Sequence, residues 1–231
     1  MKVKLISKTA LDKNYLLELM KEASEEDKKF LATIQDSEAL IAYTARVSSA
    51  NQKNPQYKKL LKYCMEHGHW SIFEMVDATV EIETTLPIAT QILRHRSFSF
   101  QQLSRRYSSD GVEFEEIKPR RQDTKNRQNS INDLHDSDKL FFKQAQESIN
   151  QVSEVYYNQA ISRGIAKESA RFLLPQTTTT KLYMKGSLRS FIHYLKVRNN
   201  DSTQKEHREI AQLVQKELKK AFPLIGEICE W

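Results

Sequence analysis

Hydrophobic and polar residues follow two periodicities along this chain, one of two residues and one of three to four. Residues 2–6 and 78–86 alternate as strands do, and 177–185 combines alternation with a run of threonines. We therefore predict three strands. Apolar residues recur at helical spacing in eight other stretches, which are predicted helices: 11–20, 37–47, 56–66, 88–93, 136–164, 166–173, 187–195 and 202–222.

Several of these helices are bounded by residues that begin or end helices. Asp36 or Ser37 is suited to cap the helix at 37–47, and Pro87 to open the helix that follows the second strand. Gly68 ends the helix at 56–66, and Pro223 closes the last segment. The helix at 136–164 is amphipathic, with one face formed by Leu140, Phe141, Ala145, Ile149, Val152, Val155, Tyr156 and Ala160.

The order of elements is strand, helices, strand, a basic loop, long helices, strand and helices. That order indicates the α+β class, with helix predominating over strand. With 231 residues the chain suits a single domain spanning 1–231. Residues 108–136 have few apolar anchors and are predicted to form a polar surface excursion, with a short strand or turn at 113–117 and with Arg120 and Arg121 solvated.

The composition is that of a soluble globular protein that attracts anions. The formal net charge is +6, and 39% of the residues are hydrophobic. No apolar run approaches the roughly 20 residues that cross a bilayer, and the first residues lack the centre of a secretion signal, so a cytoplasmic location is expected. Cys64 and Cys229 lie far apart without metal-ligand spacing, which predicts neither a disulfide framework nor a metal site.

Several common enzyme motifs are missing from the sequence. It has no Walker A or Gly-x-Gly-x-x-Gly motif among its five glycines, no His-Glu-x-x-His and no Gly-x-Ser-x-Gly. An ATPase, a Rossmann dehydrogenase, a zincin and an α/β-hydrolase therefore lose their usual support.

The densest chemistry lies in residues 94–107, which read Arg-His-Arg-Ser-Phe-Ser-Phe-Gln-Gln-Leu-Ser-Arg-Arg-Tyr. Four guanidiniums, an imidazole and three serine hydroxyls gather the donors that bind phosphate or carboxylate. A solvated basic turn is the alternative interpretation. The interleaved Phe98, Phe100 and Tyr107 add an apolar side, which favours a pocket wall and a phosphorylated ligand.

Arg94-His95-Arg96, then seven residues, then Ser104 resembles the signature of the flavin-dependent thymidylate synthases. The block at 67–74, His-Gly-His-Trp-Ser-Ile-Phe-Glu, is similar to the family's His-Gly-His…Phe-Glu block. Residues 170–175, 188–190 and 195–198 resemble its C-terminal half. Together these matches span about residues 37 to 210.

The resemblance implies an enzyme that converts dUMP to dTMP by reductive methylation. N5,N10-methylenetetrahydrofolate would supply the carbon, and FAD reduced by NADPH would supply the hydride. The resemblance also implies a mixed β-sheet flanked by long helices, and a homotetramer whose active sites are shared between subunits. This family holds FAD with arginines, histidines and helix ends, so a missing glycine-rich loop does not exclude the cofactor.

The resemblance further assigns individual residues. Those that bind FAD would be His69, Ser71, Arg94, His95, Arg96, Gln102, Ser187, Arg189 and His193. Those that bind dUMP would be Gln91, Arg94, Gln102, Leu103, Ser104, Arg105, Arg106, Arg171 and Arg198. Arg198 would be the catalytic residue, because a fixed guanidinium stabilises negative charge at N3 and O2 of uracil and makes C5 more nucleophilic.

Two positions depart from the family pattern. Gln102 stands where some members carry an acidic residue, so this chain offers an amide without a charge. After Arg198, the stretch 199–206 retains the Gln and Glu of the family's run, as Gln204 and Glu206, but lacks its histidine.

A thiolate mechanism is disfavoured by the positions of the cysteines. Classical methylation of uracil needs an activated cysteine that adds to C6. Cys64 lies on the apolar stripe of a predicted helix, and Cys229 lies close to the C-terminus. If the chain makes thymidylate, a bound flavin must drive the reaction instead.

The rival hypothesis is a protein that binds single-stranded nucleic acid without catalysis. Arginines at 94–106 would follow the phosphates, and Phe98, Phe100 and Tyr107 would stack on bases. Such a protein should spread basic and aromatic residues over one face. Here they are concentrated in one stretch and accompanied by distant blocks at matching intervals, so the enzyme is the preferred hypothesis.

Overall fold

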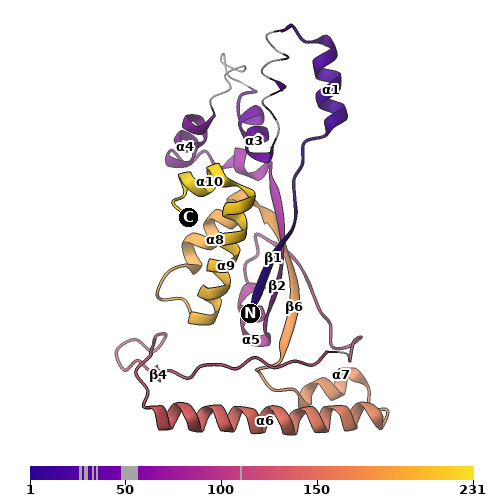
Figure 1. Ribbon diagram of the computed structural model, residues 1–231, viewed down its shortest axis with the longest axis vertical. Coiled ribbons are helices and arrows are strands. Elements are labelled where there is room, and N and C mark those ends of the chain that lie inside the picture. Colours follow the sequence, from indigo (N-terminus) through magenta and orange to yellow (C-terminus); the bar gives the residue numbers. More distant parts are fainter. Residues whose placement is uncertain (26–27, 29–30, 33, 35, 48–56, 110) are drawn as a thin grey trace.

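The fold centres on a four-stranded sheet that carries helices on one side (Figure 1). The computed structural model describes residues 1–25, 28, 31–32, 34, 36–47, 57–109 and 111–231. The strands, in spatial order, are β1 (Lys2–Lys8), β2 (Asp77–Thr85), β6 (Thr179–Ser187) and β3 (Ser99–Gln102). The helices are α1 (Lys13–Glu22), α3 (Ser37–Ala45), α4 (Lys58–Glu66), η1 (Trp70–Glu74), α5 (Leu86–Ile92), α6 (Asp136–Ser162), α7 (Lys167–Ala170), η2 (Arg171–Leu173), α8 (Leu188–Arg198), α9 (Lys205–Ala221) and α10 (Pro223–Ile228).

Every strand pairing in this sheet is antiparallel. β2 and β6 pair along their whole lengths, from Asp77 opposite Ser187 to Thr85 opposite Thr179. β1 and β3 join the two edges of this pair, each running opposite to its neighbour. The α+β class is therefore confirmed, but the expected mixed sheet is wrong for the described strands, because none of their connections is a crossover that returns a strand parallel to its neighbour.

The two faces of the sheet differ in character. Val80 and Ile82 of β2 are fully buried on the face that the helices cover. On the other face, Nζ of Lys181 lies 3.5 Å from a carboxylate oxygen of Glu81 and 3.2 Å from one of Glu83. One face thus builds the core, and the other carries cross-strand charge pairs.

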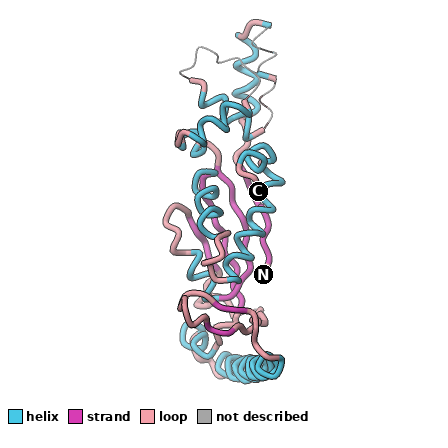
Figure 2. Tube along the Cα trace, turned by 90° about the vertical axis from the view of Figure 1, so that its left-hand side faces the viewer, coloured by secondary structure: helices cyan, strands magenta, loops and turns pink. Residues whose placement is uncertain are grey.

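The core lies between the sheet and the helices α5, α8, α9 and α10. Its largest fully buried side chains include Phe191 and Tyr194 of α8 and Ile88 and Ile92 of α5. Figure 2 shows the molecule from the side as elongated, with α6 seen end-on at one end. None of the helices in the described part of the chain combines the length and apolar character that crossing a bilayer requires.

The predicted helix ends agree with the structure where capping residues mark them. Asp36 caps α3, because its Oδ1 accepts a hydrogen bond from the backbone N–H of Ala39 at 2.8 Å. Gly68 follows α4 with a φ of 73°, a conformation that favours glycine. Residue 56, the predicted start of α4, lies outside the described residues. α9 ends at Ala221, directly before Phe222 and Pro223, as predicted. Pro223 also opens α10, since a first helical position needs no N–H donor.

α6 lies across the end of the sheet and confirms the predicted long helix (Figure 1). The side chains that it buries are Gln146, Tyr157 and Ala160. The apolar face predicted from its periodicity is instead mostly open to solvent, with exposed fractions between 52% and 71% for Leu140, Phe141, Ile149, Val152, Val155 and Tyr156. The described part of this chain therefore leaves most of that face uncovered.

The polar excursion at 108–136 runs beside α6 and is anchored to it (Figure 1). The Gln146 amide accepts from the backbone N–H of Ile117 at 2.9 Å and donates to its carbonyl at 3.2 Å. A short hairpin follows, formed by β4 (Arg121–Gln122) and β5 (Ser130–Ile131).

The prediction that both excursion arginines are solvated is half right. The side chain of Arg121 is 43% exposed, in an ion pair with Asp133. The prediction is wrong for Arg120, whose side chain is 13% exposed because it reaches inward to the buried carboxylate of Glu206.

Gly186 of β6 allows the chain after α5 to close on the sheet. A Cβ atom at this position would stand 2.5 Å from Cδ1 of Phe98, closer than two carbons can approach. The Phe98 ring also packs against Phe191, with ring centroids 4.9 Å apart. The glycine therefore leaves space for the Phe98 ring, which packs the turn at 94–98 against β6 and α8.

Candidate functional site

Arg198, the last residue of α8, lies against the imidazole of His95 in the turn after α5. Nε of Arg198 donates a hydrogen bond to Nε2 of His95 at 2.8 Å. Because a guanidinium only donates, Nε2 of His95 must carry a lone pair. Burial, the charge of Arg198 and His193 lower the pKa of His95 from 6.5 to about 4. His95 is therefore neutral at pH 7. It accepts from Nε of Arg198, which leaves the two terminal Nη groups of the guanidinium for other partners.

A second neutral imidazole, His207 of α9, packs beside this pair. It is fully buried, and its ring centroid lies 6.1 Å from that of His95. Burial, Arg198 and His95 lower the pKa of His207 from 6.5 to about 3. Sequence reasoning found only that a histidine was missing from 199–206. The signal that could have revealed His207 was its place on the apolar stripe of an amphipathic helix.

Gln91 of α5 connects this histidine to the residues after Arg198. Its Oε1 lies 3.2 Å from Nδ1 of His207, and its Nε2 donates to Oε1 of Gln204 at 2.7 Å. Nε2 of Gln204 donates in turn to Glu206 at 2.9 Å. Gln91, predicted to bind dUMP, is thus held between His207 and Gln204, and Gln204 is bound in turn to Glu206.

The three residues of the Arg-His-Arg motif point in different directions. Arg94 and Arg96 are exposed, whereas His95 is half-buried between them and turns toward α8. The alternation follows from the tight turn, in which the N–H of His95 bonds to the carbonyl of Ile92 at 3.0 Å. The two arginines can therefore reach a ligand at the surface while His95 holds Arg198 from within.

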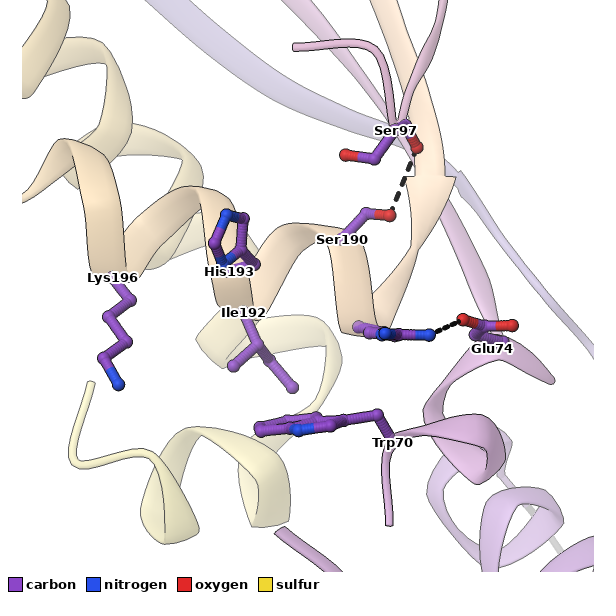
Figure 3. Close-up of a pocket in the computed structure, with 8 residues that line it drawn as sticks. Trp70, Glu74, Ser97, Ser190, Ile192, His193 and Lys196 are labelled. Atoms are coloured by element: carbon purple, nitrogen blue, oxygen red, sulfur yellow. Dashed lines mark hydrogen bonds and ion pairs between the residues drawn. The ribbon is translucent and has the colours of Figure 1, made fainter. Parts of the chain in front are cut away.

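A cavity of about 480 Å³ opens beside α8 (Figure 3). Trp70 of η1 lies below Ile192 of α8 in this view, and Arg189 pairs with Glu74 at one end. The remaining lining residues are Ser97, Ser190, His193 and Lys196. An aromatic platform, cations and hydroxyls together suit a ligand that joins aromatic rings to phosphates.

The structure brings some of the predicted FAD residues to this cavity and places others at its borders. Arg189 and His193 line it directly. Ser187 caps α8, where its Oγ accepts from the N–H of Ser190 at 3.3 Å. His69 and Ser71 are exposed at the beginning of η1, on either side of Trp70.

The residues predicted to cradle the nucleotide phosphate divide into two groups. Nη2 of Arg106 lies 3.4 Å from the carboxylate of Glu168, and Nε of Arg171 donates to the carbonyl of Glu168 at 3.2 Å. Both exposed arginines therefore contact Glu168, Arg106 at its carboxylate and Arg171 at its backbone carbonyl, although they lie far apart in sequence. Arg105 differs from them because it is buried and donates to the carbonyl of Gly111 at 2.9 Å.

The segment before Arg105 is fixed to β6. Nε2 of Gln102 donates to Oγ1 of Thr180 at 3.3 Å, and the N–H of Leu103 donates to the carbonyl of Lys181 at 2.8 Å. The Leu103 side chain is 40% exposed, and Ser104 is half-buried. Gln102 to Ser104 thus form a rigid strand end that leads to the arginines.

Neither cysteine is placed to act as a nucleophile. Cys64 is buried on α4, and burial raises the pKa of its thiol. Burial also raises the pKa of Cys229 to about 11. Because the thiolate is the reactive form, both thiols are inert at neutral pH, as the sequence had indicated.

Comparison with known proteins settles the family. Residues 29–224 match the family described as Thymidylate synthase complementing protein. The chain is 58% identical over 194 residues to a flavin-dependent thymidylate synthase from Synechocystis sp., covering 84% of this chain and 90% of that protein. This chain belongs to the flavin-dependent thymidylate synthases. It is also 43% identical to a probable member from Paramecium bursaria Chlorella virus 1, over 86% of this chain and 93% of that one.

The fold of this flavin-dependent thymidylate synthase is also found in a solved structure. A UMP/dUMP methylase from Streptomyces cacaoi, crystallised with 5-Br UMP, superposes with a TM-score of 0.78. The alignment covers 98% of this chain and 92% of that one, at 22% sequence identity. The resemblance confirms the fold over nearly the whole chain.

The buried histidines make the stability of this thymidylate synthase depend on pH. The pKa of His207 in the folded protein lies below its ordinary value of 6.5. Between these two values the unfolded state binds a proton at this residue and the native state does not. The contribution of His207 to the free energy of unfolding is therefore fully present above pH 6.5. Below pH 6.5 it falls by about 1.4 kcal/mol per pH unit. Urea unfolding at about pH 7 and about pH 4.5 should show the loss.

Replacement of His207 by glutamine provides the control for this prediction. Glutamine can still donate to Gln91 but does not titrate, so the variant should lose less stability than the wild type between the same two pH values. An equal loss in both proteins would show that His207 does not resist protonation.

Proposed function

We propose that this chain converts dUMP to dTMP with N5,N10-methylenetetrahydrofolate as carbon donor, and with NADPH and FAD as the reducing system. The observation that carries the proposal is the Arg198–His95 pair, found in a chain 58% identical to a flavin-dependent thymidylate synthase. The family membership favours this enzyme over the nucleic-acid binder. We propose that the enzyme is cytoplasmic, where the free thiols of Cys64 and Cys229 stay reduced.

The cavity beside α8 fits FAD in its chemistry. Trp70 supplies a ring for stacking, and Arg189 and Lys196 supply charge for a diphosphate. The residues that would hold the cofactor are His69, Ser71, Arg94, His95, Arg96, Gln102, Ser187, Arg189 and His193. When reduced, FAD would supply the hydride that completes the methyl group on the nucleotide.

Arg198 would act on the uracil ring by its charge. C5 of uracil is a weak nucleophile until negative charge is stabilised at N3 and O2. His95 accepts the Nε–H of Arg198 and is neutral, so it orients the guanidinium without neutralising it. The fork formed by the two Nη groups would then face the pyrimidine, with Gln91 beside it.

The nucleotide phosphate would be bound by arginines from two separate segments. Arg106 contacts the carboxylate of Glu168, and Arg171 contacts the backbone carbonyl of the same residue. A phosphate would take the place of the Glu168 carboxylate at Arg106, and Arg171 would donate to it by turning from the backbone carbonyl of Glu168. The other residues proposed to bind dUMP are Gln91, Arg94, Gln102, Leu103, Ser104, Arg105 and Arg198.

The enzyme would assemble as a homotetramer with active sites shared between subunits. The apolar face of α6 supports this, since a row of exposed aromatic and branched side chains is typical of an interface. Arg94 and Arg96 project outward, where they could reach a cofactor held by a neighbouring subunit.

Two measurements test the proposed function. The purified protein, after incubation with excess FAD, should show flavin absorption bands that stay with it through gel filtration. Supplied with dUMP, methylenetetrahydrofolate and NADPH, it should form dTMP, and omission of any one should stop the reaction. A protein that retained no flavin and formed no dTMP would refute the proposal.

A further inference from the structure

A chain of hydrogen bonds links the polar excursion to the proposed nucleotide site. Nη1 and Nη2 of Arg120 donate to the two carboxylate oxygens of Glu206, at 2.6 and 3.0 Å. Nε2 of Gln204 donates to the same carboxylate at 2.9 Å, and Nε2 of Gln91 donates to Oε1 of Gln204 at 2.7 Å. Oε1 of Gln91 then lies 3.2 Å from Nδ1 of His207.

The ion pair at one end fixes the direction of every bond in this chain. A carboxylate only accepts, so Gln204 must turn its Nε2 toward Glu206. The Oε1 of Gln204 then faces Gln91 and can only accept, so Gln91 must donate to it from Nε2. The Oε1 of Gln91 is left for His207, which must donate from Nδ1.

Because Glu206 is buried, it needs Arg120 to stay ionised and so to fix the direction of these hydrogen bonds. The side chain of Glu206 is 7% exposed and that of Arg120 13%. Burial alone would raise the pKa of Glu206, but hydrogen bonds from Arg120, the backbone and Gln204 outweigh it and lower the pKa. Without the guanidinium, the pKa of this buried carboxyl group would rise, and its protonated form could donate as well as accept.

We propose that Arg120 is a positioning residue for dUMP binding, because it sets the orientation of the Gln91 amide through Glu206 and Gln204. The inference rests on the proposed function, in which Gln91 contacts dUMP. The two ends of a carboxamide have nearly the same shape but opposite hydrogen-bonding character. A flipped Gln91 would therefore present a donor where the nucleotide needs an acceptor, or the reverse. The polar excursion thereby takes part in substrate binding.

The adjacent arginine offers a matched control. Arg120→Gln and Arg121→Gln remove the same charge from neighbouring positions, but only Arg120 reaches Glu206. By calorimetry, Arg120→Gln should raise the Kd for dUMP about tenfold, the effect of one hydrogen bond. Arg121→Gln should stay within about twofold of the wild type, and both variants should keep the flavin content of the wild type.

A double variant separates positioning from support of the fold. Arg120→Gln combined with Glu206→Gln leaves no buried charge unpaired, so it should recover most of the stability against urea. Its Kd for dUMP should stay high, because an amide in place of the Glu206 carboxylate accepts and donates alike and no longer fixes Gln204. If Arg120→Gln alone does not fold, the double variant decides the question.

Three results would overturn the inference. They are an Arg120→Gln variant that binds dUMP as tightly as Arg121→Gln, a double variant with wild-type affinity, and wild-type protein that binds no dUMP. Only the last result would also overturn the proposed function, so the two failures can be told apart.

Discussion

Replacement of Arg198 by lysine should lower the rate of dTMP formation by about a hundredfold while flavin stays bound. Lysine keeps the positive charge but lacks the planar fork and cannot donate to His95 with the geometry of Nε. Loss of one fixed donor at a developing anion typically costs a factor of about 10² to 10³. Single-turnover formation of dTMP, together with NADPH oxidation and the flavin spectrum, measures the change.

Arg208→Lys is the control for this variant. Arg208 lies on α9 and pairs with Asp201, so the substitution makes the same chemical change outside the site. Its rate should stay within about twofold of the wild type. Near-normal dTMP formation in Arg198→Lys would remove the planar guanidinium from the mechanism.

Two glutamates on the apolar face of α6 should break the proposed tetramer and with it the activity. The side chains of Ile149 and Tyr156 are 56% and 58% exposed in the single chain, and they lie seven residues apart on one face. Ile149→Glu with Tyr156→Glu would place two carboxylates in an apolar interface, where an unpaired charge is strongly unfavourable. Light scattering should show a mass well below that of the wild type, and flavin retention should fall.

The same helix provides a matched control. Gln144 and Gln151 are also exposed and also seven residues apart, but they lie on a different side of the helix from Ile149 and Tyr156. Gln144→Glu with Gln151→Glu adds the same charge and should leave the mass and the flavin content unchanged. If both double variants had the mass of the wild type, α6 would not hold the assembly together.

Local signals in the sequence account for most of the elements. Helix ends followed from capping residues such as Asp36 and Gly68, and strands from alternation in β2 and β6. The Arg-His-Arg motif and its spacing to Ser104 led to the correct family. These features depend on neighbours within a few residues, which is what periodicity and motif spacing report.

The missed features all depend on contacts between distant parts of the chain. Arg120 looked solvated because its partner, Glu206, lies 86 residues away in sequence. His207 looked like an ordinary helix residue until α5 and α8 placed Gln91 and Arg198 next to it. The strand directions, and the exposure of the apolar face of α6, likewise depend on the tertiary arrangement rather than on local pattern.

The close approach of Phe98 to Gly186 links two positions that must change together during evolution. A side chain at 186 is compatible with this fold only if residue 98 becomes small, since a Cβ atom there would overlap the aromatic ring. Among related sequences, substitutions at these positions should therefore appear as compensating pairs. A protein with a side chain added at 186 alone should fold poorly, and a second substitution of Phe98 by a small residue should restore folding.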